Sequence, residues 1–275
     1  TRYTKVKLHH GKGQIEMDYQ HLLVDQQENV LIIRFNVPEK RNALISDMRQ
    51  ELLQVLERAE KDENVRCIVL TGEGKAFSAG GDLSSLKELK PLDGRKLLQS
   101  AQPLMMKLLE IEKPIIAAVN GPAAGAGFSL ALLCDLIIAS DQAFFVQSFV
   151  NVGLIPDFAA MHFLPKLVGM HKAKELMFLG ERISAEEARE IGIVNRVVSA
   201  DSLLEETLKL AKQLAEKAPI SIGMMKKIMN QHHNHDVKVL LELEAQGQEI
   251  CFQTEDFQEG ARAFFEKRQP RFQGK

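Results

Sequence analysis

The first part of the chain changes from an alternating pattern of apolar and polar residues to a helical one. Two extended segments, His21–Asp25 and Asn29–Asn36, flank a short polar turn, and this arrangement predicts a β-hairpin. A helix is predicted next, because apolar residues then recur at helical spacing at Leu52, Val55, Leu56 and Ala59. Asp47 stands three residues before Gln50, which resembles a capping box and predicts the start of this helix.

The middle of the chain alternates short apolar segments with small-residue loops. We predict strands at Arg66–Thr71, Ile115–Asn120, Asp135–Ala139 and Ala143–Gln147. A helix is predicted between the first two of these strands, broken at Pro103 and continuing to about Glu112, and another is predicted from about Gly127. Strands that alternate with helices are typical of an α/β core.

Beyond Pro156 the pattern becomes mainly helical. Helices are predicted at Asp157–Leu167, at Lys172–Leu179 closed by Gly180, and at Ser184–Ile191 closed by Gly192, before one more strand at Ile193–Val198. From Asp201 onward only helical periodicity is present. We therefore expect a polar N-terminal extension outside the fold at residues 1–16, an α/β core at residues 17–200, and a helical region at residues 201–275.

Composition narrows the class of protein but not its function. The 275 residues include 35 basic and 37 acidic side chains, so no excess of charge favours binding to nucleic acid. The apolar stretch Pro114–Ser140 is interrupted by polar residues and is interpreted as buried core, without membrane insertion. Three well-separated cysteines and the lack of an apolar segment in residues 1–16 predict a reducing, cytoplasmic location.

Several familiar motifs fail on inspection. Gly74-Lys75 is followed by Ala76, so it is not a phosphate loop, and Gly125-Ala126-Gly127 lacks the third glycine of a dinucleotide fingerprint. Ser129 nearly fits a nucleophile elbow but is predicted to lie inside a helix, which leaves a serine hydrolase as a less favoured alternative. The residues His232, His233 and His235 are interpreted as solvated side chains, so no metal site is predicted.

Two small-residue loops remain, and each follows an apolar strand and leads into a helix. They are Phe77–Asp82 and Asn120–Gly127. Small side chains allow a ligand to approach the backbone, and two convergent N–H groups would form an oxyanion hole. Close packing of a helix against a sheet explains the same residues equally well, so the two interpretations stay open at this point.

Five segments in order along the chain resemble those of one family. They are Asn36–Leu44, Lys75–Leu83, Pro114–Ala139, Gly180–Gly192 and Phe264–Arg268. From about Met17 the chain resembles the crotonase, or enoyl-CoA hydratase/isomerase, superfamily. The resemblance implies an α/β spiral of ββα units, a C-terminal helical region that forms a trimer or a dimer of trimers, acyl-CoA thioester substrates, and no cofactor.

The resemblance also implies roles for individual residues. The oxyanion donors would be the N–H groups of Ala79 and Ala126. The CoA moiety would be held by the backbone and loop residues Ala43, Ala76, Phe77, Gly80 and Asp82, with Lys40 or Arg41 at its phosphates. Phe264 and Lys267 would reach the active site of a neighbouring subunit, although core packing is an equal alternative for Phe264.

The carboxylates distinguish between reactions. The two glutamates of a hydratase in this family correspond here to Ser129 and Phe149, whereas Asp157 matches the single acid of enoyl-CoA isomerases and of epoxyphenylacetyl-CoA isomerase. One base suffices for a 1,3-proton shift, and the apolar neighbours Ile155, Pro156 and Phe158 predict a raised pKa for Asp157. Asp157 could also cap a helix. An isomerase is therefore predicted, with a hydratase and a non-catalytic CoA-binding protein as alternatives.

Overall fold

A six-stranded sheet forms the centre of the computed structural model, which describes residues 4–10, 13–231 and 235–275. Its strand order is β11-β8-β6-β5-β4-β3, and only the β3–β4 pair is antiparallel. The strands are β3 (Leu22–Gln27), β4 (Val30–Phe35), β5 (Cys67–Gly72), β6 (Ile115–Val119), β8 (Leu136–Ser140) and β11 (Arg196–Val198). The predicted hairpin and the predicted strands of the core are thus confirmed, with ends that differ by a few residues.

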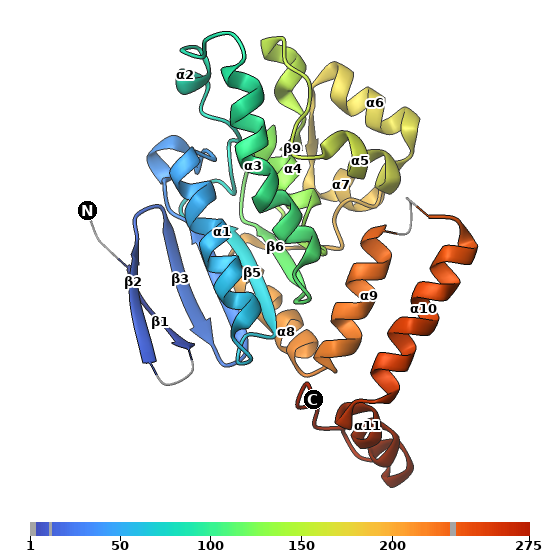
Figure 1. The fold of residues 1–275 in the computed structure, drawn as a ribbon. Helices are drawn as coiled ribbons and strands as arrows, with labels where there is room; N and C mark the ends of the chain where they lie inside the picture. The colour runs from blue at the N-terminus through green and yellow to red at the C-terminus, as the bar shows by residue number, and fades with distance from the viewer. Residues whose placement is uncertain (1–3, 11–12, 232–234) are drawn as a thin grey trace.

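Two smaller sheets complete the β-structure of the described residues. One has the order β10-β9-β7 and contains β7 (Ala123–Ala124), β9 (Phe144–Val146) and β10 (Arg182–Ser184). The other pairs β1 (Thr4–His10) with β2 (Gly13–Tyr19) in antiparallel register. Much of the predicted N-terminal extension is therefore a hairpin, which lies beside β3 at the edge of the molecule (Figure 1).

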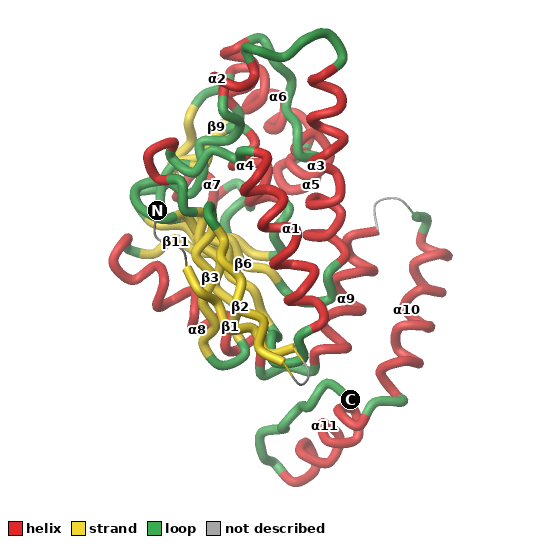
Figure 2. Tube along the Cα trace, turned by 60° about the vertical axis from the view of Figure 1, so that its left-hand side comes forward, coloured by secondary structure: helices red, strands yellow, loops and turns green. Residues whose placement is uncertain are grey.

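Helices cover both faces of the central sheet, because successive strand residues point to opposite sides. Leu31, Ile33, Ile68 and Leu70 pack with α1 (Ser46–Lys61) and α3 (Asp93–Glu110). Val30, Ile32, Cys67 and Val69 pack with α8 (Leu203–Ala215) on the other face. Figure 2 shows the strands between α1 and α8. The helix α8, which follows residue 200, therefore covers one face of the central sheet.

Two local predictions about these helices are wrong. The first residue of α1 is Ser46 and its N-cap is Ile45, with no side-chain cap, so the pair Asp47 and Gln50 forms no capping box. The predicted apolar face of α1 is nevertheless buried. Pro103 does not break α3, which continues through it. Leu104 and Leu108 are buried beyond the proline, so packing against the core offsets the hydrogen bond that proline removes.

The remaining helices of the core are short. They are α2 (Leu83–Leu86), α4 (Ala126–Leu132), α5 (Ala160–Val168), α6 (Met170–Leu179) and α7 (Ala185–Glu190), with 3-10 turns η1 (Pro38–Lys40), η2 (Ser148–Val152) and η3 (Ala200–Ser202). The predicted end of α6 at Gly180 and the capping box of Ser184 with Glu187 are both confirmed. Among the described residues, no helix is both long and apolar enough to cross a membrane.

The C-terminal helices extend away from the core. They are α9 (Pro219–Gln231), α10 (Val237–Phe252) and α11 (Glu255–Glu266), and α10 and α11 project to one side in Figure 1. Lys226 of α9 ties this region to the core, because its buried ammonium group lies 2.7 Å from the Asp135 carboxylate and 3.1 Å from the Lys113 carbonyl. α9 therefore anchors this region to the core, and much of α10 and α11 is exposed.

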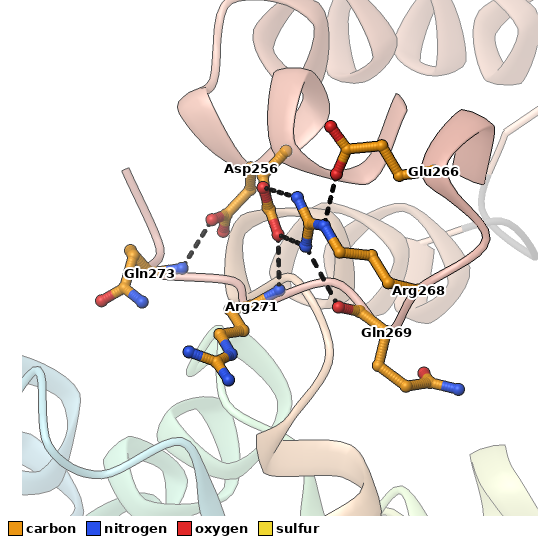
Figure 3. A network of polar contacts seen from close by, with 7 residues as sticks. Asp256, Glu266, Arg268, Gln269, Arg271 and Gln273 are labelled. Carbon is orange, nitrogen blue, oxygen red and sulfur yellow. Dashed lines mark hydrogen bonds and ion pairs between the residues drawn. The ribbon is translucent and has the colours of Figure 1, made fainter. Parts of the chain in front are cut away.

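The chain after α11 folds back onto that helix. The Asp256 carboxylate accepts the N–H groups of Gln273 and Gly274 at 2.6 and 2.8 Å. Arg268 pairs with the carboxylate of Glu259. It also pairs with that of Glu266, as Figure 3 shows. This network holds the end of the chain in a fixed path.

Candidate active site

The two small-residue loops are joined by backbone hydrogen bonds. Ser78 forms a parallel β-bridge with Ala123, and the Ala124 N–H donates to the Ser78 carbonyl at 2.9 Å. A Cβ added at Gly80 would lie 2.6 Å from the Ala124 carbonyl, and one at Gly127 would lie 2.7 Å from the Ser78 Cβ. Glycine at these positions is therefore required for close packing. The same packing brings the backbone of one loop beside the helix start of the other.

The backbone N–H groups of these loops differ in whether they already have a partner. The Ala79 N–H donates to the Arg41 carbonyl at 2.8 Å, and the Gly80 N–H donates to Ser78 Oγ at 3.2 Å. Within the described chain, no acceptor lies on the N–H of Gly81 or on that of Ala126, the first residue of α4. The two N–H groups that remain available to an oxyanion are thus those of Gly81 and Ala126. The prediction of the Ala79 N–H as an oxyanion donor is corrected, because this group already donates to the Arg41 carbonyl.

Sequence reasoning missed Gly81 because the Ala79-Gly80-Gly81 segment offers three consecutive N–H groups. Which of them is free depends on a partner that is distant in sequence, the Arg41 carbonyl. The backbone turns sharply at Arg41 and Asn42, which both have a positive φ, 51° and 55°, and we call this turn the Arg41 bend. A backbone conformation of this kind persists only where surrounding contacts fix it.

Asn42 supplies those contacts. Its side chain is fully buried, accepts the Val37 N–H at 3.0 Å and donates to the carbonyls of Glu73 and Ala76 at 2.9 and 2.7 Å. Its own carbonyl accepts the Ser78 hydroxyl at 2.8 Å. Asn42 therefore fixes the Arg41 bend to the segment that leads into the first loop and to the start of that loop, a role that the sequence did not reveal.

The predicted CoA-binding residues gather around this bend. Lys40 lies 2.8 Å from Asp82 in an exposed ion pair, and this contact holds the pKa of the Asp82 carboxyl well below its usual range. Arg41 is exposed, whereas Ala43 and Ala76 are buried. Phe77 packs its ring against Phe35 at 5.4 Å in the core. Lys40 and Arg41 thus remain accessible to an anion, whereas the Phe77 side chain does not.

Asp157 lies between η2 and α5. Its Oδ1 atom is buried and has no hydrogen-bond partner among the described residues. Burial raises the pKa of the Asp157 carboxyl to about 6, although the positive charge of Arg49 lowers it. The predicted direction of the shift is confirmed. Of the three apolar neighbours expected to cause it, Phe158 is buried, Pro156 is partly buried and Ile155 is 74% exposed.

Asp157 does not begin a helix. Phe158 and Ala159 have left-handed backbone, with φ of 50° and 59°, and α5 starts only at Ala160 with Ala159 as its N-cap. The predicted start at Asp157 is therefore wrong, and Asp157 is not the N-cap of α5. Capping of α5 therefore does not explain the aspartate at this position.

The two positions that correspond to hydratase glutamates hold no acid. Ser129 is buried within α4, and its hydroxyl donates to the Gly125 carbonyl at 3.2 Å. The Phe149 ring lies 3.7 Å from the position of a Cβ at Gly125. Residues 232–234 of the histidine-rich segment lie outside the described residues, and no cluster of metal-ligating side chains is found in the described part.

Phe264 and Lys267 are not brought to this site within one chain. They belong to the end of α11, which lies at the far end of the molecule from α2 and α4 (Figures 1 and 2). The Phe264 side chain is 79% exposed, so the core-packing alternative is wrong for this chain.

Comparison with known proteins agrees with this architecture. A family model described as enoyl-CoA hydratase/isomerase matches residues 25–275. The short-chain-enoyl-CoA hydratase of Clostridium acetobutylicum is 37% identical, with 92% of this chain and 97% of that protein covered. The 1,2-epoxyphenylacetyl-CoA isomerase of Escherichia coli is 35% identical, with 93% and 99% covered. The crystal structure of an enoyl-CoA hydratase from Bacillus anthracis superposes with a TM-score of 0.90 at 34% identity, covering 93% and 100%.

The chain belongs to the enoyl-CoA hydratase/isomerase family and has the crotonase fold, a mixed α/β core with a C-terminal helical region. It is thus a member of a family of acyl-CoA enzymes. Relatives named as hydratases and one named as an isomerase both match over nearly their whole length. The choice between the two reactions depends on the site itself.

Proposed function

We propose that this protein is an enoyl-CoA isomerase that shifts a double bond by proton transfer through Asp157. The observation that carries this proposal is the half-buried Asp157 carboxyl, whose Oδ1 atom has no partner among the described residues and whose pKa is raised to about 6. It is combined with Ser129 and Phe149 where a hydratase would have its acids. A base with a pKa near the working pH transfers protons in both directions efficiently. Hydration normally requires a second acid or base, and a 1,3-proton shift does not.

The mechanism uses one carboxylate and two backbone donors. The thioester oxygen accepts hydrogen bonds from the N–H groups of Gly81 and Ala126. Asp157 removes a proton from C2 of a 3-enoyl-CoA, and the electron pair moves into the thioester to give a dienolate, whose charge the two donors stabilise. The protonated Asp157 then returns the same proton to C4, and the double bond lies between C2 and C3.

The CoA moiety would lie along the Arg41 bend. Lys40 and Arg41 supply positive charge for phosphates, provided that Lys40 exchanges its partner Asp82 for the ligand. The backbone of Ala43, Ala76 and Gly80 lies beside this bend. We assign the nucleotide side of the acyl-CoA to it on this basis.

Self-association would complete the site. The α9–α10 surface contains a groove of 600 Å³ that includes Met225, Met229 and Leu241, whose side chains are 54%, 67% and 58% exposed. Exposed apolar surface of this kind favours contact with another subunit. In a trimer or a dimer of trimers, Phe264 and Lys267 of one subunit would reach the CoA of the next. The enzyme would act in the cytoplasm.

Replacing Asp157 with asparagine tests the proposal directly. In the isomerase assay, conversion of 3-hexenoyl-CoA to 2-hexenoyl-CoA should fall at least 100-fold in D157N, with the circular dichroism spectrum unchanged. Full turnover by a folded D157N variant would refute the assignment. The matched control is Asp93→Asn, a partly exposed aspartate at the start of α3.

Hydratase is the second candidate, because relatives from Clostridium acetobutylicum and Bacillus anthracis carry that name. Addition of water to crotonyl-CoA at a rate comparable with isomerisation would favour it. Labelling of Ser129 by a fluorophosphonate would support a hydrolase instead. Binding of acyl-CoA without exchange of its α-protons in deuterated water would indicate a protein that binds CoA without catalysis.

A further inference from the structure

Ser129 has the only polar side chain of α4, a helix whose seven residues are all buried. A hydroxyl group buried among apolar side chains is costly unless it has a hydrogen-bond partner. The partner here is the Gly125 carbonyl, which accepts the Ser129 hydroxyl at 3.2 Å and also accepts the Ser129 N–H at 3.0 Å. One residue thus donates two hydrogen bonds to the same carbonyl oxygen.

The Gly125 carbonyl belongs to the same peptide group as the Ala126 N–H. The described chain contains no cis peptide bond, so in this planar group the N–H points away from the carbonyl oxygen. A contact that fixes the direction of the carbonyl therefore fixes the direction of the N–H as well. The Ala126 nitrogen lies 2.9 Å from the position of a Cβ at Gly80, so it lies against the loop that contains Gly81, the other available donor.

The backbone at Gly125 depends on neighbouring contacts for its orientation. Its φ is 51°, in the region that favours glycine, and glycine is the most flexible residue of the chain. The Gly125 N–H donates to the Val146 carbonyl at 2.9 Å, and the Phe149 ring lies 3.7 Å from the position of a Cβ at Gly125. These contacts hold the nitrogen and the Cα of Gly125, and Ser129 holds its carbonyl.

The hydroxyl also strengthens the donor. A peptide group whose carbonyl accepts hydrogen bonds is polarised, and its own N–H then donates more strongly, by about 10 to 30% per hydrogen bond. A serine hydroxyl bonded to the carbonyl four residues earlier also occurs in helices where no activity depends on it. The two cases are distinguishable, because only a positioning role changes the hydrogen bond that a bound thioester accepts.

We propose that Ser129 is a positioning residue, whose hydroxyl orients and polarises the Gly125–Ala126 peptide group so that the Ala126 N–H is directed at the thioester oxygen. Ser129 acts through the backbone and does not itself contact the substrate. This inference rests on the proposed function in one respect, that the Ala126 N–H is an oxyanion donor. It does not depend on Asp157 as the base.

The first test is kinetic. Ser129→Ala removes the hydroxyl and keeps the hydrogen bond of the backbone N–H. In the conversion of 3-hexenoyl-CoA to 2-hexenoyl-CoA, kcat should fall about 3- to 10-fold, the effect of one neutral hydrogen bond. KM should change little, because the dienolate depends on this donor more than the bound substrate does. Ser129→Cys has a similar shape and a weaker donor, so its kcat should lie between the other two values.

The second test reports on the same contact without turnover. Hexanoyl-CoA with an isotope label at the thioester carbonyl is bound to the full chain, and infrared difference spectroscopy measures its stretching frequency. Binding to the unmodified protein should lower the frequency below its value in water. The decrease should be smaller in Ser129→Ala and intermediate in Ser129→Cys. The matched control Ser140→Ala removes another buried hydroxyl, at the end of β8, and should leave kcat and the frequency unchanged.

The outcomes separate this inference from the proposed function. Equal kcat and equal carbonyl frequency in Ser129→Ala and the unmodified protein would overturn the inference, whatever the melting temperature. A higher KM at an unchanged kcat would also overturn it. If D157N keeps full isomerase activity while Ser129→Ala reduces the frequency shift, the proposed base is wrong and this inference stands. If D157N is inactive and Ser129→Ala is normal in both measurements, this inference alone is rejected.

Discussion

Replacing Asp157 with asparagine should stabilise the protein at neutral pH while it abolishes proton transfer. The carboxyl has a pKa near 3.8 in an unfolded chain and about 6 in the folded protein, because burial disfavours its charged form. An acid whose pKa rises on folding binds more protons in the folded state over this interval. Ionised Asp157 therefore destabilises the fold, and the effect grows as the pH increases from about 4 to about 6.

The size of the effect follows from the shift. A difference of about two pKa units, at about 1.4 kcal/mol each, gives about 3 kcal/mol. Below about pH 3 the carboxyl is protonated in both states and contributes almost nothing. Above pH 6.5 it is ionised in both states and the full cost is present. Asparagine has nearly the same shape and no charge, so D157N avoids this cost.

Urea denaturation of the two proteins at several pH values measures this difference. At pH 8 the free energy of unfolding of D157N should exceed that of the unmodified protein by about 2 to 3 kcal/mol, and at pH 4 the two should agree within about 0.5 kcal/mol. The partly exposed control Asp93→Asn should show no such loss of stability with rising pH. Equal or lower stability of D157N at pH 8 would show that Asp157 is not held in a desolvated state, and would remove the basis for its raised pKa.

Three further predictions concern the loops and the framework. Ala126→Pro removes one oxyanion donor at the first position of α4, where a helix tolerates proline, and kcat should fall about 100- to 1000-fold with the melting temperature nearly unchanged; a normal kcat would exclude this N–H from catalysis. Lys226→Met leaves buried Asp135 without its partner and should lower the free energy of unfolding by about 3 to 5 kcal/mol, whereas Lys227→Met breaks an exposed pair with Glu112 and should cost about 1 kcal/mol or less; similar urea midpoints would contradict the attachment of α9 to the core. Ser184→Ala removes the confirmed capping box of α7 and should cost about 1 kcal/mol in the same assay, and no loss would show that the cap contributes little.

Periodicity and local capping signals predicted the parts of the fold that depend on neighbouring residues. The buried positions of α1, the end of α6 at Gly180 and the capping box at Ser184 all follow from spacing within a few residues. Pro103 was misjudged because core packing on both sides of it overrides the local preference. The start of α5 was misjudged because Phe158 and Ala159 adopt left-handed backbone, which ordinary propensities do not favour.

The site was less predictable than the fold for a related reason. Asp157 could be found because its role depends on its own chemistry and on the residues beside it. The hydrogen bond from the Ala79 N–H to the Arg41 carbonyl joins residues that are distant in sequence, and no local pattern encodes it. A backbone donor is useful only if nothing else occupies it, so its identification requires the folded structure.

The close contact at Gly80 and Gly127 also limits how this protein can change. Any side chain at Gly80 would overlap the Ala124 carbonyl, and one at Gly127 would overlap Ser78, so substitution there would separate the two loops. A mutagenesis library aimed at new substrates would lose folded members at these positions and gain nothing. Phe149 instead approaches the start of α4 through its side chain, with its ring 3.7 Å from the position of a Cβ at Gly125. The backbone junction is thus the invariable part of the catalyst, and new specificities would have to arise from side chains around it, such as those of the η2 segment.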